Sequence, residues 1–149
     1  MKKRIISIVL LVLWMITVFL FSAQDATRSS RVSGNLTDTM LDLLNVSEEH
    51  KETAETLIRK LAHFTIYTVG GVLAMWCFGE CKFENRKNII ISQIFGTLYA
   101  ITDEIHQYFV PGRACQFRDI VIDSLGVATG ILLVLILKNI AKDIKEKSK

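Results

Sequence analysis

Four long apolar segments restrict what this chain of 149 residues can fold into. They cover residues 5–21, 61–78, 89–109 and 120–137. Each is long enough to cross the hydrocarbon core of a bilayer as a helix, which takes about 17 to 25 residues. Half of all residues are hydrophobic and only one is a proline, which is typical of an integral membrane protein. We therefore predict a single all-α membrane domain over residues 1–149, with four transmembrane helices.

The distribution of basic residues predicts the orientation of these helices. The two ends of the chain and the 79–88 connection carry 11 of the 18 Lys and Arg residues, whereas 22–60 and 110–119 carry the other 7. Cytoplasmic loops carry such an excess, so we expect both termini in the cytoplasm. The net charge of +3 then reflects orientation and gives no sign of nucleic-acid binding. The alternative is a signal peptide cleaved near Ala23, but 5–21 exceeds the usual apolar core of about 7 to 15 residues.

The long segment 22–60 is predicted to lie outside the cell and to contain one or two extracytoplasmic amphipathic helices. Apolar residues recur there at helical spacing, which suits a helix on the membrane surface or against a partner. These residues are Val32, Leu36, Met40, Leu43 and Leu44. Ser47, followed by Glu48 and Glu49, is typical of a helix N-cap. We expect a helix to begin there and to continue into the second span.

Ionisable residues within the predicted spans are the candidates for function, because a charge at membrane depth is costly unless it is paired or solvated. The second span begins with Lys60, His63 and Tyr67 on one helical stripe. In the third span Asp103, His106 and Gln107 share a face, with Glu104 about 100° away. The fourth begins with Asp119 and Asp123, in line with Gly126 and Gly130, which would let another helix approach closely.

With alternating helix directions, these three groups of polar residues meet at the outer face, whereas the inner halves 69–78 and 127–137 carry no charge. An outward-facing polar site is one interpretation. Hydrogen bonding that only holds helices together is the other, with pairs such as His63 with Asp103 or Arg113 with Asp119.

Motifs for other chemistry are absent from the sequence. Two histidines near four carboxylates make a metal site conceivable, but no His-Glu-x-x-His or paired-cysteine spacing occurs, so no metal and no cofactor is predicted. There is no Gly-x-Ser-x-Gly motif for a serine nucleophile. The odd set of Cys77, Cys81 and Cys115 predicts no disulfide framework.

Two motifs resemble the VanZ-like family of small bacterial membrane proteins. They are RKLAHFTIYTVGG at 59–71 and TDEIHQYFVPGRACQFRDIVIDSLGVATG at 102–130, and the FSAQD that closes the first span matches as well. The resemblance implies a bacterial cell membrane location and an association with low-level resistance to the glycopeptide teicoplanin, but no settled biochemical activity. The positions that match the family pattern are Lys60, His63, Tyr67, Asp103, Glu104, His106, Gln107, Arg113, Asp119 and Asp123.

Three functions remain open from the sequence. In an enzyme, a lipid or lipid-linked cell-wall precursor with an anionic group is held by Arg113, Lys60, Tyr67 and Gln107. The catalytic candidates are Asp103, His106, Asp119, His63, Asp123 and Glu104. In a binding or shielding protein, the same cleft and the external segment engage a precursor, a drug or a partner protein without turnover. A small transporter is the third, and the sequence does not give the oligomeric state.

Overall fold

The computed structural model describes residues 1–23, 51–81, 83–111, 113 and 115–147, and these residues form four α-helices and no strand. The helices are α1 (Lys2–Ser22), α3 (Lys51–Gly79), α4 (Asn85–Tyr108) and α5 (Phe117–Lys147). The all-α prediction is thus confirmed for the described part of the chain. Three of the helices, α1, α3 from Thr53 onward and α5, are long and apolar enough to cross a membrane. The predicted external helix at 32–44 and the predicted N-cap at Ser47 lie outside the described residues.

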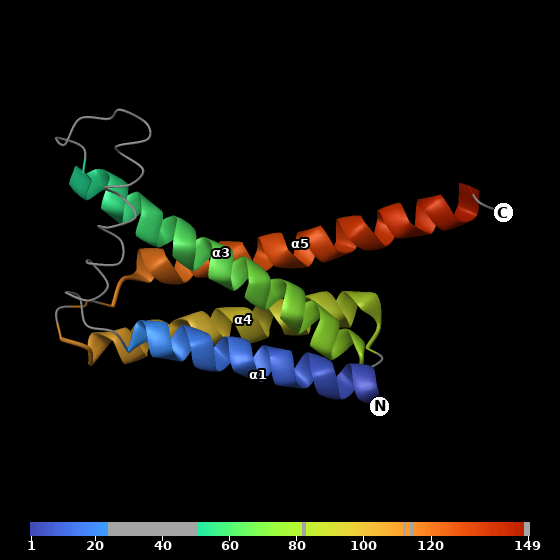
Figure 1. Ribbon diagram of the computed structural model, residues 1–149, viewed down its shortest axis with the longest axis horizontal. Helices are drawn as coiled ribbons and strands as arrows, with labels where there is room; N and C mark the ends of the chain where they lie inside the picture. Colours follow the sequence, from blue (N-terminus) through green and yellow to red (C-terminus); the bar gives the residue numbers. More distant parts are fainter. Residues whose placement is uncertain (24–50, 82, 112, 114, 148–149) are drawn as a thin grey trace.

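The four helices run in alternating directions (Figure 1). One end of the molecule therefore holds the end of α1, the start of α3, the end of α4 and the start of α5. We call this end the site end, because the polar residues singled out in the sequence lie on the ends of α3, α4 and α5 and in the loop between α4 and α5. Helix α3 makes its most extensive contacts with α5, and it also packs on α4 and α1. The chain thus brings three sequence-distant segments together around α3.

The molecule has an apolar exterior and a partly polar interior. Large apolar side chains such as Leu20, Leu98 and Leu132 point outward and are exposed. The buried polar side chains are Ser7, Ser22, Asn88, Ser92, Asp103, Glu104, Gln107 and Asp123. A water-soluble protein cannot expose so much contiguous apolar surface, whereas hydrocarbon chains of lipid would cover it favourably. The burial pattern therefore supports the membrane-protein assignment independently of hydropathy.

Helix α4, the third predicted span, is less apolar than the other three, and its burial explains why. Its buried residues are Asn88, Ser92, Gly96, Ala100, Asp103, Glu104 and Gln107, most of which are polar or small. Its outward residues include Ile90, Ile94, Leu98 and Ile105. The polar face lowers the average hydropathy although the outer face is as apolar as that of its neighbours. The helix also ends one residue earlier than predicted, with Phe109 as its C-cap.

Trp14 is the residue of α1 that packs most closely on α3. Its indole nitrogen donates a hydrogen bond to the carbonyl oxygen of Ile66 at 2.8 Å, and its ring lies against Gly70. The same ring contacts Tyr67 edge-on, with centroids 5.6 Å apart. A side chain added at residue 70 would displace the indole, so this glycine makes room for the contact. Trp14 thereby fixes the face of α3 that carries Tyr67.

Helices α3 and α5 approach each other through glycines. A Cβ atom on Gly126 would lie 2.6 Å from the carbonyl oxygen of Phe64, and one on Gly130 would collide with the carbonyl of Thr68. On the α3 side, Gly71 lies equally close to the backbone of Val127. The prediction that Gly126 and Gly130 permit close approach is confirmed. This contact brings the start of α5 beside the first half of α3.

Helix α5 is longer than the predicted span 120–137, since it runs to Lys147. At about 1.5 Å per residue, its 31 residues extend about 46 Å, more than the roughly 30 Å of a hydrocarbon core. Its last part projects beyond the other helices (Figure 1). Lysine, glutamate and alanine, which make up much of 138–147, favour helix, so the helix continues after the apolar run has ended.

Candidate functional site

Three helices each contribute one side chain to a compact polar cluster at the site end. His63 comes from α3, Asp103 from α4 and Asp123 from α5, and one donor atom of each lies within 4.8 Å of the others. The Nδ1 atom of His63 lies 3.6 Å from a carboxylate oxygen of Asp123. Asp123 is completely buried and Asp103 is 5% exposed. We call these three residues the His-Asp-Asp cluster.

The local sequence explains why these residues point inward. Asp103 continues the inner face of α4, on which Gly96 and Ala100 precede it at helical spacing. Asp123 lies one turn before Gly126 on the glycine face of α5, so the close contact with α3 carries its carboxylate toward His63. The cluster is therefore a product of helix packing and needs no loop to assemble it.

A chain of hydrogen bonds connects the cluster to the loop between α4 and α5. The amide nitrogen of Gln107 donates to a carboxylate oxygen of Asp103 at 3.0 Å. The amide oxygen of Gln107 accepts from a guanidinium nitrogen of Arg113, also at 3.0 Å. Both ends of the amide are thus satisfied and its orientation is fixed. Gln107 holds one oxygen of Asp103 in place and leaves the other available to a neighbour.

Glu104 and Asp119 form a second acidic pair beside the cluster. One carboxylate oxygen of Glu104 accepts a hydrogen bond from the backbone N–H of Gln116 at 2.8 Å. This contact attaches α4 to the loop just before α5. Asp119 lies in the first turn of α5, where a carboxylate interacts favourably with the helix dipole. One oxygen of Glu104 and the charge of Asp119 are therefore stabilised by the fold itself.

Several buried polar atoms at this end have no hydrogen-bond partner among the described residues. They include the Tyr67 hydroxyl, both carboxylate oxygens of Asp123, one oxygen of Glu104 and one of Asp119. Tyr67 is completely buried and lies close enough to Asp103 and Asp123 to interact with both. Buried polar groups are nearly always paired in folded proteins, so an unpaired group of this kind indicates a missing ligand, ion or water. The unpaired atoms gather around the His-Asp-Asp cluster.

Two arginines bring positive charge to the same end. Arg113 precedes α5 and Arg59 lies one turn before His63 on α3. Burial lowers the pKa of the Arg113 guanidinium, and the nearby positive charge of Arg59 adds to this effect, while Asp103, Glu104 and Asp119 oppose it. Arginine stays protonated at any physiological pH, so both side chains remain cationic. Within the part of the chain that the structure describes, neither arginine forms an ion pair with a carboxylate.

His106 is a candidate from the sequence that the structure does not bring into the cluster. Its imidazole stacks on the ring of Phe19 in α1, with centroids 4.5 Å apart. Its Nε2 atom is buried and has no partner among the described residues. Glu104, expected on a different face, is instead fully buried next to Asp103. Helix α4 is packed by α1, α3 and α5, so its interior arc is wide enough to include residues about 100° apart.

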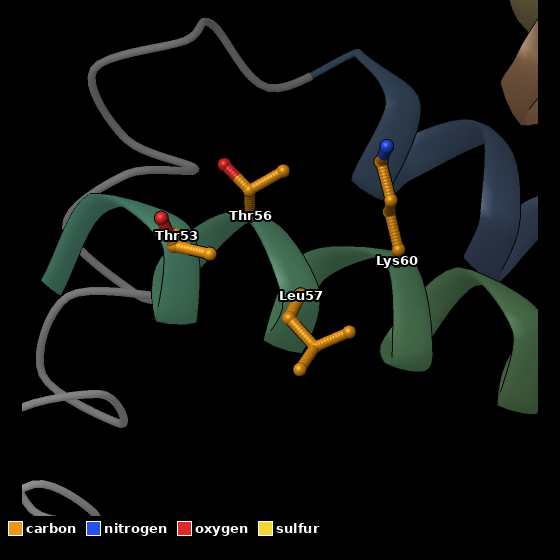
Figure 2. Close-up of a pocket in the computed structure, with 4 residues that line it drawn as sticks. All are labelled: Thr53, Thr56, Leu57 and Lys60. Carbon is orange, nitrogen blue, oxygen red and sulfur yellow. The ribbon is translucent and has the colours of Figure 1, made fainter. Parts of the chain in front are cut away.

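Lys60 lies toward the rim and not in the cluster. It lines a shallow hollow along the first turns of α3, together with Thr53, Thr56 and Leu57 (Figure 2). His63, one turn further into the bundle, faces Asp123 instead. The predicted stripe of Lys60, His63 and Tyr67 therefore runs from the rim into the buried cluster, and its members have different surroundings.

A protein-family model described as VanZ/LLP1 matches residues 7–138, which is most of the chain. The chain belongs to the VanZ/LLP1 family. The matched range includes every candidate site residue and the greater part of all four helices. Searches of curated proteins and of solved structures found no match. The resemblance derived from the two sequence motifs is thereby confirmed.

Sequence reasoning missed two features of this VanZ/LLP1 site. Arg59 was not singled out, although it precedes His63 by four residues and so lies on the same helix face, which was the available signal. The backbone N–H of Gln116 holds Glu104, and no sequence pattern indicates such a contact. The pairings also differ from those expected, because His63 faces Asp123 and Arg113 bonds Gln107.

Proposed function

We propose that this protein binds the phosphate-bearing headgroup of an anionic lipid or lipid-linked cell-wall precursor at the outer face of the bacterial membrane. The observation that carries the proposal is that the positive charge of the Arg113 guanidinium faces no carboxylate at ion-pair distance among the described residues. The only hydrogen bond of this guanidinium within the described residues is to the neutral amide of Gln107, and Arg59 lies close enough to repel it. Guanidinium groups bind phosphate through paired, charge-assisted hydrogen bonds. A bound phosphate would neutralise both arginines at once.

The proposed orientation places this site outside. We infer that α4 crosses the membrane as the fourth span, since its outward residues are apolar and only its buried face is polar. Residues 1–149 then form one domain with both termini in the cytoplasm, as the excess of basic residues at the ends and at 79–88 supports. Lys60, at the rim, adds a further positive charge for an anionic headgroup.

Turnover of the bound lipid is a second candidate, and the buried carboxylates favour it. His63, Asp103 and Asp123 lie within reach of one another, and Tyr67 adds a hydroxyl to which no described residue is hydrogen-bonded. Groups of this kind can transfer protons to and from a substrate. In this proposal Glu104, His106 and Asp119 supply further proton-transfer groups, and Gln107 orients Asp103. A protein that only bound the headgroup would not need so many buried ionisable groups beneath the arginines.

The test compares two arginine variants of the full chain purified in mild detergent. Arg113→Gln removes the charge at the site, and Arg118→Gln removes the same charge from an exposed position at the same end. Native mass spectrometry and lipid extraction measure which lipids each protein retains. We expect a phosphate-bearing lipid on the wild type and on Arg118→Gln, and at least about a tenfold lower amount on Arg113→Gln. Equal retention by the two variants would show that Arg113 does not bind the headgroup.

A contribution to teicoplanin resistance would follow if the bound lipid is a cell-wall precursor. Expression of the chain in a susceptible bacterium should then raise the minimal inhibitory concentration of teicoplanin. The Asp103→Asn variant, present in the membrane at an equal amount, should not raise it. If the wild-type chain does not change the minimal inhibitory concentration, resistance is not part of the function. Headgroup binding would still be decided by the lipid measurement.

A further inference from the structure

We propose that His63, Asp103 and Asp123 bind a divalent transition-metal ion of the zinc or manganese type. The three side chains come from three different helices and offer one imidazole nitrogen and two carboxylate oxygens within 4.8 Å of one another. The site was not expected from the sequence, because its ligands are separated by 40 and 20 residues and follow no short spacing motif. It becomes visible only when the helices are packed.

The distances suit a site that closes around an ion. Metal–ligand distances of about 2.0 to 2.2 Å place neighbouring donor atoms about 3 to 4.4 Å apart. The nitrogen of His63 and the oxygen of Asp123 are 3.6 Å apart, too far for a hydrogen bond but within this range. Small side-chain rotations would bring the third donor into place. The spacing of the donor atoms therefore fits a shared ion.

The unpaired atoms around the cluster give a second, independent reason. Asp123 is completely buried, and neither of its carboxylate oxygens has a hydrogen-bond partner among the described residues. The buried Tyr67 hydroxyl, also without a partner there, lies near Asp103 and Asp123. It could bond to a water molecule on the ion. A cation would satisfy the carboxylates of Asp103 and Asp123 together, which His63 alone cannot do.

The surroundings hold two of the three ligands, Asp103 and Asp123, as metal sites require. Gln107 donates a hydrogen bond to one oxygen of Asp103 and leaves the other to coordinate. The contact of Gly126 with the backbone of α3 fixes the height of Asp123 against His63. Such second contacts orient the ligands of metal sites and raise their affinity.

The donor set indicates the class of ion. Imidazole nitrogen is a poor ligand for magnesium and calcium, which prefer oxygen only, whereas zinc and manganese accept mixed nitrogen and carboxylate donors. With three protein ligands, at least one coordination position remains for water or for a substrate oxygen. This inference stands without the proposed function, since it uses none of the arginine contacts.

The test measures metal bound to the full chain in detergent. Wild type, Asp123→Asn, His63→Gln and Asp143→Asn are dialysed against Zn²⁺ alone or Mn²⁺ alone, then against metal-free buffer, and their metal content is determined by plasma mass spectrometry. Asp143→Asn is the matched control, because it removes the same charge from the exposed end of α5. Only variants that elute like the wild type in size exclusion are compared. His63→Gln keeps the test decisive should Asp123→Asn fail to fold.

We expect about one ion per chain in the wild type and in Asp143→Asn, and at least about a tenfold lower content in Asp123→Asn and His63→Gln. A wild type that retains neither ion would overturn the proposal, as would site variants that retain as much as the control. Arg113→Gln separates this inference from headgroup binding, since at saturating Zn²⁺ it should keep the ion while losing the lipid. A wild type that retains the lipid but no ion would overturn the ion site alone, and a wild type that retains the ion but no phosphate-bearing lipid would overturn headgroup binding alone.

Discussion

Asp123 lacks the contacts expected of a residue that only joins helices. It is completely buried, its nearest partner is the imidazole of His63 at 3.6 Å, and no described residue donates a hydrogen bond to it. A polar residue that only joins helices would be hydrogen-bonded across the interface, as Asn88 is to the carbonyl oxygen of Met75 at 3.0 Å. Asn88 thus has the contacts of a residue that joins helices, whereas the carboxylate of Asp123 is available to a ligand, as proposed above.

The stacked His106 gives a residue-scale prediction about stability. Replacing His106 by phenylalanine keeps the ring on Phe19 and removes a buried nitrogen that has no partner among the described residues. We expect the free energy of unfolding to rise by about 1 kcal/mol, because an unsatisfied buried polar atom is lost and apolar contact is retained. Thermal unfolding in detergent measures the change.

Phe19→Ala is the control for this variant, since it removes the stack and should lower the unfolding temperature. A lower unfolding temperature for His106→Phe would mean that its nitrogen has a partner that stabilises the fold. A more stable His106→Phe protein that no longer retains lipid would assign His106 to function.

At the level of single residues, the sequence predicted which positions lie together at one end of the molecule better than it predicted what each of them contacts. Helical spacing was sufficient to group Asp103 with Gln107, and their hydrogen bond confirms it. It could not show that His63 faces Asp123, because this depends on the height at which α3 and α5 pack. Nor could it show that Glu104 is buried, because that depends on how many helices surround α4.

Among the elements, the pair of α3 and α5 determines the geometry of the site. Its two backbones approach through Gly71, Gly126 and Gly130, and this contact lies directly next to His63 and Asp123. Membrane helices gain stability from such close packing, because lipid offers no hydrophobic driving force between them. Any change that separates the two helices should therefore affect the cluster as well as stability.

Gly126→Ala tests this coupling. The added Cβ would lie 2.6 Å from the carbonyl oxygen of Phe64, a backbone atom that cannot move away alone. We expect a loss of about 1 to 3 kcal/mol in the free energy of unfolding, as for other overpacked contacts. Thermal unfolding in detergent again provides the measurement.

Gly79→Ala is the matched control, since its Cβ would meet only the side-chain nitrogen of Asn88, at 3.2 Å. Equal stability of the two alanine variants would contradict the close packing of α3 against α5.

The extent of the elements was predictable where hydrophobicity alone decides it. The predicted spans at 5–21 and 61–78 lie within α1 and α3, because the apolar runs coincide with buried or lipid-facing turns. The end of α5 was underestimated, since charged residues that favour helix continue beyond the apolar run. The polar face of α4 lowered its hydropathy, and only the packing shows that this face is interior.

For the whole molecule, the proposed function depends on the orientation of the chain in the membrane. Two native cysteines can report this orientation. Cys115 is exposed next to the site end, and Cys81 lies partly exposed just after α3, at the opposite end. The positive residues predict that Cys115 is outside and Cys81 is inside.

Two variants that each keep one of these cysteines test the orientation, with Cys77 replaced by serine in both. We expect a membrane-impermeant maleimide to label Cys115 in intact cells, and to label Cys81 only after the membrane is permeabilised. Labelling of Cys81 in intact cells would show the opposite orientation, with the site end in the cytoplasm. That result would contradict a ligand in the outer leaflet.

The glycine contacts also bear on how freely this chain can change during evolution. A side chain at residue 126 or 130 would meet mainly backbone atoms of α3, whichever side chains stand at residues 64 and 68. The spacing of the two helices is thus insensitive to the identity of Phe64 and Thr68. The glycines themselves have no such freedom. Substitutions at residues 64 and 68 can therefore accumulate without changing the height at which His63 and Asp123 face each other.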